Sequence, residues 1–128
     1  APTGPALRVV LGDDVEPLRA LARFVLEEDG GIEVVGEAGD AQSAIDLCAD
    51  VAPDAVLLDL SMPGMDGLEA IPRLRRVTPG VTVVVFSGFA AERMAQAALD
   101  QGAARYLEKG AELSEVREAL LEATGRAA

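Results

Sequence analysis

Residues 56–67 read VLLDLSMPGMDG, and this stretch indicates the fold more directly than any other. Residues 55–58 form an uninterrupted apolar run, which is typical of a strand buried on both faces of a parallel sheet. The run meets a carboxylate at Asp59 before the chain turns through Pro63 and Gly64. Asp is common in turns because its side chain accepts hydrogen bonds from nearby backbone N–H groups. Asp59 alone therefore has two interpretations, a turn residue or a functional carboxylate.

Four further apolar runs predict strands at 7–11, 32–35, 81–86 and 106–107. Helix-length stretches separate them, and in the first of these Leu18, Leu21 and Val25 are expected to share the buried face. Strands that alternate with helices predict an α/β fold with a doubly wound parallel sheet and helices on both faces. Glu33 and Arg105 make the second and fifth strands more polar, so both are predicted edges. The expected strand order is the flavodoxin-like 2-1-3-4-5.

Composition excludes several classes of function. The 128 residues include 11 basic and 22 acidic ones, and the net charge of -11 should repel nucleic acid and anionic membranes. The longest apolar runs are far shorter than the ~18 residues of a membrane-spanning helix. The absence of histidine excludes a Ser-His-Asp triad and imidazole metal sites. The single cysteine, Cys48, permits no intrachain disulfide and suits a reducing cytoplasm.

Polar residues follow four of the predicted strands. Asp13 and Asp14 follow the first strand, Asp59 the third, Ser87 the fourth and Lys109, the only lysine, the fifth. Carboxyl ends of parallel strands meet at one edge of the sheet, where ligands of such folds bind. An N-cap role is the alternative for Asp14, but it explains neither neighbouring carboxylate. Three carboxylates this close repel one another unless a cation joins them, and an oxygen-only ligand set favours Mg2+.

These residues together resemble the receiver domain of two-component response regulators. The resemblance rests on the Asp13-Asp14 pair, the DLSMPGMDG segment that begins at Asp59, Ser87, and Lys109 three residues after Tyr106. It extends over residues 6–124 and implies flexible termini at 1–5 and 125–128. The segment EVVGEAGDAQSAIDL is most similar to receivers that precede a helix-turn-helix output domain. One departure is Gly110, since the family commonly has a proline after a cis peptide at this position.

The resemblance implies a role for each residue of the predicted site. Asp59 would accept a phosphoryl group from a sensor histidine kinase or a phosphotransfer protein. Asp14, Asp59 and the backbone carbonyl of Ser61 would hold Mg2+, and Asp13 would bind it either directly or through a metal-bound water. Lys109 and the Ser87 hydroxyl would contact the phosphoryl oxygens.

Three further positions are assigned by the same resemblance. Tyr106 is either an aromatic residue packed at the sheet edge or the rotating switch residue that responds to Ser87, and its spacing to Lys109 favours the switch. Ser61 and Phe89 would flank the path of the water that hydrolyses the acyl phosphate. The implied partners also include a covalently linked output domain outside this chain, and a second copy of the chain that pairs with it on phosphorylation.

Two other classes of function compete with the switch. An aspartyl-phosphate hydrolase would also use an Asp at a strand end with Mg2+, but such enzymes usually carry a second Asp where this chain has Ser61. A phosphorylation-independent interaction module would not need the five polar residues of the predicted pocket. We therefore predict a phosphoacceptor that promotes its own phosphotransfer and dephosphorylation, and not a multiple-turnover enzyme.

Overall fold

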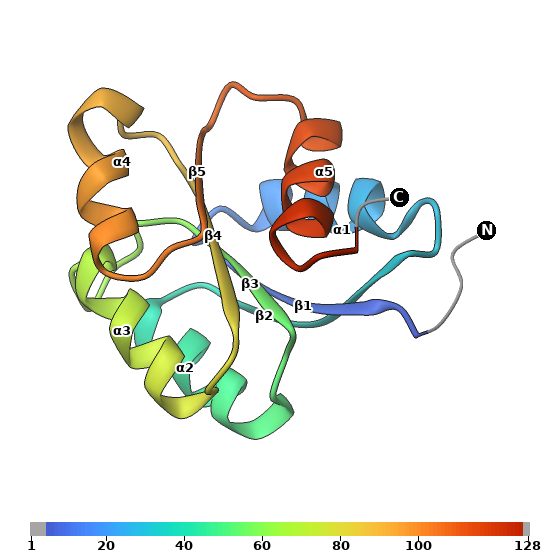
Figure 1. The fold of residues 1–128 in the computed structure, drawn as a ribbon, viewed down its shortest axis with the longest axis horizontal. Coiled ribbons are helices and arrows are strands. Elements are labelled where there is room, and N and C mark those ends of the chain that lie inside the picture. The colour runs from blue at the N-terminus through green and yellow to red at the C-terminus, as the bar shows by residue number, and fades with distance from the viewer. Residues whose placement is uncertain (1–4, 127–128) are drawn as a thin grey trace.

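A computed structural model describes residues 5–126, which form one five-stranded parallel sheet with helices on both faces (Figure 1). The strands are β1 (Leu7–Gly12), β2 (Ile32–Ala38), β3 (Ala55–Leu58), β4 (Thr82–Ser87) and β5 (Arg105–Glu108). Their order is β2-β1-β3-β4-β5, which confirms the predicted doubly wound arrangement with the second and fifth strands at the edges.

Five helices cover the sheet in two layers. They are α1 (Glu16–Glu27), α2 (Ala41–Val51), α3 (Gly67–Val77), α4 (Ala91–Asp100) and α5 (Leu113–Ala123). Figure 1 shows α1 and α5 on one face of the sheet and α2, α3 and α4 on the other. Successive side chains of a strand point to opposite faces, so Val9 and Leu11 pack beneath α1 and α5 while Val10 packs on the opposite side.

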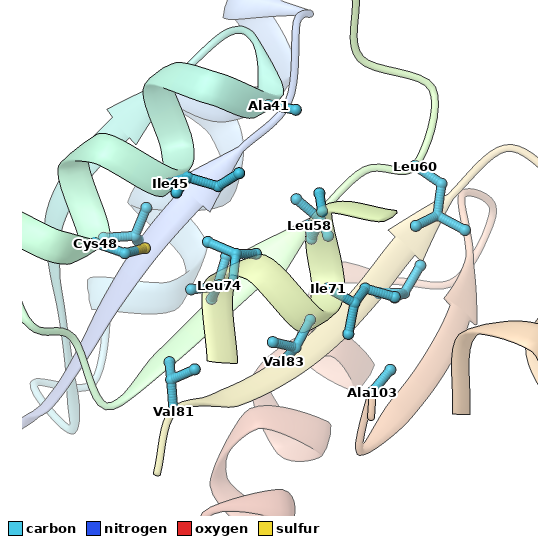
Figure 2. Packing of buried hydrophobic residues seen from close by; sticks show 14 of the residues in the cluster. Ala41, Ile45, Cys48, Leu58, Leu60, Ile71, Leu74, Val81, Val83 and Ala103 are labelled. Carbon is cyan, nitrogen blue, oxygen red and sulfur yellow. The ribbon is translucent and has the colours of Figure 1, made fainter. Parts of the chain in front are cut away.

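The larger of the two cores lies between the sheet and the helices α2, α3 and α4. Figure 2 shows Ile45 of α2 and Leu74 of α3 directed toward Leu58 and Val83 of the central strands. Cys48 belongs to this core, and burial raises the pKa of its thiol to about 12. Cys48 is thus a packed apolar side chain with no thiolate character at neutral pH.

The predicted buried face of α1 was wrong at one position. Leu21 is 54% exposed, whereas Ala22 and Leu26 are buried against the sheet. Leu18, Ala22 and Leu26, which are spaced four residues apart, face the sheet, and this leaves Leu21 on the solvent side of the helix. Arg19 and Arg23 form ion pairs with Glu37 of β2, at 3.1 and 2.8 Å. The periodicity of the sequence gives a helix but not its rotation about its own axis.

The two ends of the described segment lie near the amino ends of the strands, whereas the predicted site lies at their carboxyl ends. Arg126 donates a hydrogen bond to the carbonyl of Pro5 at 2.7 Å and lies 3.8 Å from the carboxylate of Asp54. Of the termini expected to be flexible, residues 1–4 and 127–128 lie outside the described part of the chain. Between residues 5 and 126, no helix is long and apolar enough to cross a bilayer.

Candidate functional site

The carboxyl ends of β1, β3, β4 and β5 meet at one edge of the sheet and bring the predicted residues there. Asp13 and Asp14 follow Gly12 of β1, and Asp59 follows Leu58 of β3. The backbone N–H of Asp59 donates to the carbonyl of Gly12 at 2.8 Å, which fixes the two strand ends side by side. The site is therefore built at the switch point of the sheet, between β1 and β3.

Asp59 is buried, with 2% of its surface exposed, and every hydrogen bond to its carboxylate comes from Ser61 or Lys109. The Ser61 N–H donates to Oδ1 at 3.0 Å, and the Lys109 ammonium donates to Oδ2 at 2.9 Å. Burial acts to raise the pKa of Asp59, but the Ser61 N–H, the Lys109 ammonium and the Ser61 hydroxyl outweigh it, and the pKa lies below its ordinary value. The carboxylate is therefore ionised at neutral pH.

Lys109 joins the two buried carboxylates of the site. Its ammonium lies 2.7 Å from Oδ2 of Asp13 and 2.9 Å from Oδ2 of Asp59. Burial acts to lower the pKa of Lys109, but hydrogen bonds to the two carboxylates and their negative charges outweigh it and hold the pKa above its ordinary value. Lys109 is thus a fixed positive charge placed between Asp13 and Asp59.

Three carboxylates form a group that could hold a metal ion. One oxygen each of Asp13, Asp14 and Asp59 lies within 4.8 Å of the others. Asp13 and Asp59 are buried whereas Asp14 is exposed, so the group opens to solvent on the Asp14 side. The donors are all hard oxygen atoms, and a small divalent cation such as Mg2+ prefers such ligands while it keeps several waters. The residues present therefore fit the predicted cation.

The expectation that Asp14 could cap the first helix is wrong. The N-cap of α1 is Val15, and no side chain caps it. Asp13, and not Asp14, folds back on the chain, because its Oδ1 accepts a hydrogen bond from the Val15 N–H at 2.9 Å. Asp14 keeps its carboxylate free of this local bond and adds a third negative charge to the site.

The loop after Asp59 holds Ser61 in place through a close contact at Gly67. A Cβ atom at Gly67 would lie 2.3 Å from the carbonyl oxygen of Leu60, so only glycine fits where the loop folds back on the start of α3. The Asp66 side chain caps this helix by accepting a hydrogen bond from the Leu68 N–H at 3.0 Å. The loop therefore returns tightly to α3 and keeps Ser61 against Asp59.

Ser87, Phe89 and Tyr106 lie together beside Lys109. Ser87 is fully buried, and its backbone carbonyl accepts a hydrogen bond from the Lys109 N–H at 2.7 Å. The Tyr106 hydroxyl donates to the backbone carbonyl of Phe89 at 2.6 Å, and Phe89 is 45% exposed. The structure thus connects Tyr106 to the loop that follows Ser87. The Lys109-Gly110 peptide is trans, as are all others in the described chain.

Two charged residues of the site were not predicted from the sequence. Arg19 of α1 donates a hydrogen bond to the backbone carbonyl of Asp13 at 2.5 Å and forms an ion pair with Glu37 of β2. A partial signal existed, because Glu37 is an acidic residue between Gly36 and Ala38, but it lies beyond the strand predicted at 32–35, and β2 extends to Ala38. The partner of Glu37 lies 18 residues away on a helix whose rotation the sequence does not reveal.

A doubly wound sheet whose carboxyl edge carries three Asp residues, a buried Ser and a Lys defines a class of protein, the phosphoacceptor domains built on the flavodoxin-like fold. Residues 9–121 match the response regulator receiver domain, and the chain belongs to this family. The prediction of a receiver domain of a two-component system is therefore confirmed.

Several relatives show how far the likeness extends. The response regulator UvrY of Escherichia coli strain K12 is 40% identical over 114 residues, which cover 89% of this chain and 52% of UvrY. The chain thus spans about half the length of this relative. The signal receiver domain of the putative response regulator NarL from Mycobacterium tuberculosis superposes with a TM-score of 0.89 at 34% identity and covers 97% of this chain and 100% of that one.

A third likeness is to a response regulator from Burkholderia pseudomallei that was solved with a phosphorylated aspartic acid, a calcium ion and citrate. It has a TM-score of 0.82 at 25% identity, and the match covers 93% of this chain and 69% of that one.

Proposed function

We propose that this chain is a phosphorylation-dependent switch whose phosphoacceptor is Asp59. The observation that carries the proposal is the Asp59 carboxylate, which is buried, ionised and held between Ser61 and Lys109. A carboxylate oxygen of Asp59 attacks phosphorus and forms an acyl phosphate, while the bond from phosphorus to the donor's leaving group breaks. The leaving group of a phosphohistidine donor is its imidazole, which takes up a proton from solvent.

Asp13, Asp14 and Asp59 would hold Mg2+ in this reaction, together with the backbone carbonyl of Ser61. Bound Mg2+ would supply positive charge to the phosphoryl oxygens, as divalent ions do in phosphoryl transfer. Lys109, whose ammonium lies between Asp13 and Asp59, would contribute a second positive charge to the phosphoryl oxygens, and the Ser87 hydroxyl would donate a hydrogen bond to one of them. The chain thus supplies charge and orientation, and the donor supplies the energy of its phosphoryl bond.

The switch would use the contact between Tyr106 and the loop after Ser87. A shift of Ser87 toward the phosphoryl group moves Phe89, whose carbonyl accepts the hydrogen bond of the Tyr106 hydroxyl. Any movement of that carbonyl changes the position that Tyr106 prefers, so the surface formed by α4 and β5 reports the state of Asp59. Ser61 and Phe89 flank the reacting group and set the rate of hydrolysis.

Partners follow from the family. We propose that the donor is a sensor histidine kinase or a phosphotransfer protein in the cytoplasm, and that a linked helix-turn-helix output domain receives the signal. Pairing of two phosphorylated copies is part of the same proposal. The segment itself carries a net charge of -11 and is not expected to contact DNA.

The test is phosphorylation by a small phosphodonor with Mg2+, read by intact mass. One phosphoryl group should be added to the parent and none to Asp59→Asn. Asp66→Asn is the matched control, because Asp66 is an exposed carboxylate in the same loop and only caps α3, so this variant should be labelled as the parent is. Label that persists on Asp59→Asn, or that forms equally well with EDTA, would contradict the proposal.

The lifetime of the label separates the switch from a hydrolase. A switch retains its acyl phosphate long enough for a partner to respond, whereas a hydrolase turns over many molecules of phosphodonor per chain. Ser61 stands where such hydrolases usually carry a second Asp, and its hydroxyl donates to Asp59 at 3.0 Å. Rapid multiple turnover of the phosphodonor would favour the hydrolase.

A further inference from the structure

We infer that Arg19 and Glu37 are positioning residues that orient Asp13 for cation binding. The inference rests on the proposed function, because it assigns these residues to the same Mg2+ site. Neither residue reaches the acidic group itself. They act through the backbone of Asp13, which begins the turn that carries both Asp13 and Asp14.

Arg19 is a partly buried cation with two partners. Its side chain is 16% exposed, its Nη1 donates to the Asp13 carbonyl at 2.5 Å, and its Nε donates to Oε1 of Glu37 at 3.1 Å. The guanidinium is planar and its donors are held in a rigid fork, so the two contacts define one orientation of the group. Glu37 holds the guanidinium, and the guanidinium holds the peptide of Asp13.

Four polar contacts together fix the position of Asp13. Its N–H donates to the carbonyl of Ala38 at 3.0 Å, and its carbonyl accepts from Arg19. Its carboxylate accepts from the Val15 N–H through Oδ1 and from Lys109 through Oδ2. Of these four anchors, only the Arg19 contact can be removed by a side-chain substitution outside the acidic group and its lysine. Arg19 is therefore the residue through which the orientation of Asp13 can be tested.

A β-bulge in β2 turns Glu37 toward α1. The register of β2 against β1 shifts after Val34, so that Val35 is an extra residue in the strand. Val35 packs into the core on the α2 side, and a Cβ atom at Gly36 would also meet a side chain of α2, so both residues face that side. Strict alternation from Val34 would put Glu37 on the α2 side as well. The bulge returns it to the α1 side, where Arg19 lies, and bulges near functional sites commonly redirect a side chain in this way.

The direction in which Mg2+ affinity changes when Arg19 is removed distinguishes a positioning role from a purely electrostatic one. Arg19 is a positive charge near three carboxylates, so its removal makes the site more negative and by charge alone would tighten the binding of a cation. Loss of positioning acts in the opposite direction, because Asp13 and Asp14 are then free to turn away. Groups that orient metal ligands from outside the first coordination sphere typically contribute about 10- to 100-fold in affinity.

Arg23 provides a matched control for the loss of charge. It also pairs with Glu37, at 2.8 Å, and lies one helical turn further along α1. Its other contacts are with Glu27 and the carbonyl of Val34, and it does not contact Asp13. Arg23→Gln therefore removes the same charge and one contact to Glu37, and leaves the Asp13 carbonyl bonded to Arg19.

The experiment measures Mg2+ affinity by titration calorimetry and by amide NMR shifts in the parent, Arg19→Gln, Arg23→Gln and Arg19→Lys. Arg19→Gln should bind Mg2+ about tenfold more weakly than the parent. Arg23→Gln should bind it equally or more tightly. Arg19→Lys keeps the charge, but an ammonium group lacks the planar set of donors with which Arg19 contacts Asp13 and Glu37. This variant should therefore also bind Mg2+ more weakly than the parent. The Asp13 amide should exchange faster with solvent in Arg19→Gln but not in Arg23→Gln.

Each outcome has a defined meaning. Suppose that the parent binds Mg2+ and is labelled on Asp59. Equal Mg2+ affinities of Arg19→Gln and Arg23→Gln would then overturn the inference and leave the proposed function intact. A parent that binds no Mg2+ would overturn both. If Arg19→Gln does not fold, Arg19→Lys decides the question, and parent-like affinity in that variant would overturn the inference. Failure of both variants to fold would also overturn it, because Arg19 would then maintain the fold and not the site.

Discussion

Replacement of Lys109 by Met removes the cation that joins Asp13 and Asp59 and keeps a side chain of similar length. In the folded protein the ammonium lies 2.7 Å from one carboxylate and 2.9 Å from the other. Without it, two buried carboxylates and the adjacent Asp14 face one another with no positive charge between them. We expect the variant without Mg2+ to be less stable than the parent without Mg2+. We also expect its stability to increase more than that of the parent when Mg2+ is added.

The magnitude follows from burial. Removal of one partner of a fully buried ion pair costs about 3–5 kcal/mol, and a hydrogen bond to a charged group contributes about 1.5–3 kcal/mol. Lys109 and Asp13 have 21% and 11% of their side-chain surface exposed, so solvent screens part of the interaction. We expect the free energy of unfolding to fall by about 2 kcal/mol. For a domain of this size, that change lowers Tm by roughly 6–10 °C.

Addition of Mg2+ should recover most of the lost stability. A ligand that binds only the folded state stabilises it in proportion to the logarithm of its concentration relative to Kd. The variant has no ammonium that competes for the same carboxylates, so its Mg2+ affinity should exceed that of the parent. The rise in Tm between metal-free and Mg2+-saturated protein should therefore be larger in Lys109→Met.

The assay is thermal unfolding followed by circular dichroism at neutral pH, with and without Mg2+. Arg76→Met is the control, because Arg76 is exposed on α3 and the substitution makes the same change in net charge, from -11 to -12. It should keep the Tm and the Mg2+ response of the parent within about 2 °C. A parent-like Tm in metal-free Lys109→Met, or an equal Mg2+ response in all three proteins, would refute the reasoning.

Three other predictions concern the same site. The pKa of Asp59 lies below 3.8 in the folded protein, so the stability gained from its ionised form is present above about pH 4 and lost as the pH falls through the folded pKa. The difference in Tm between parent and Lys109→Met should therefore be largest above about pH 4 and shrink as the pH falls through the folded pKa of Asp59, and a difference that does not shrink on acidification would contradict this. Phe89→Ala should shorten the lifetime of the acyl phosphate severalfold, measured by the decay of the label, because the ring no longer hinders water; an unchanged decay rate would exclude the effect. Gly67→Ala should lower the free energy of unfolding by about 1–3 kcal/mol in denaturant titrations, because the new Cβ meets the Leu60 carbonyl; parent-like stability would show that the loop can shift.

The order of the sheet and the edge at which the polar residues gather could be predicted from the sequence. Apolar runs that alternate with helices specify a parallel sheet, and the more polar second and fifth runs specify its edges. Because the carboxyl ends of parallel strands meet at one edge, Asp13, Asp59 and Lys109 had to approach one another. Their roles in phosphotransfer remain predictions, but their place at one end of the sheet followed from the order and direction of the strands.

The exact partner of each carboxylate could not be predicted in this way. Lys109 is separated from Asp59 by 50 residues, and only the folded sheet shows that its ammonium bridges Asp59 to Asp13. The need for glycine at position 67 was likewise hidden, because the atom that excludes a side chain there is a backbone oxygen of Leu60, across the turn.

The tertiary structure alone decided how α1 faces the sheet and where Glu37 points. Hydrophobic periodicity favoured Leu21 as a buried residue, but Leu18, Ala22 and Leu26 face the sheet and Leu21 is exposed. Strict alternation along β2 would place Glu37 on the α2 side, but the bulge at Val35 returns it to the α1 side. Periodicity describes neighbours along the chain, whereas rotation and register depend on contacts between distant segments, and those contacts exist only once the sheet has formed.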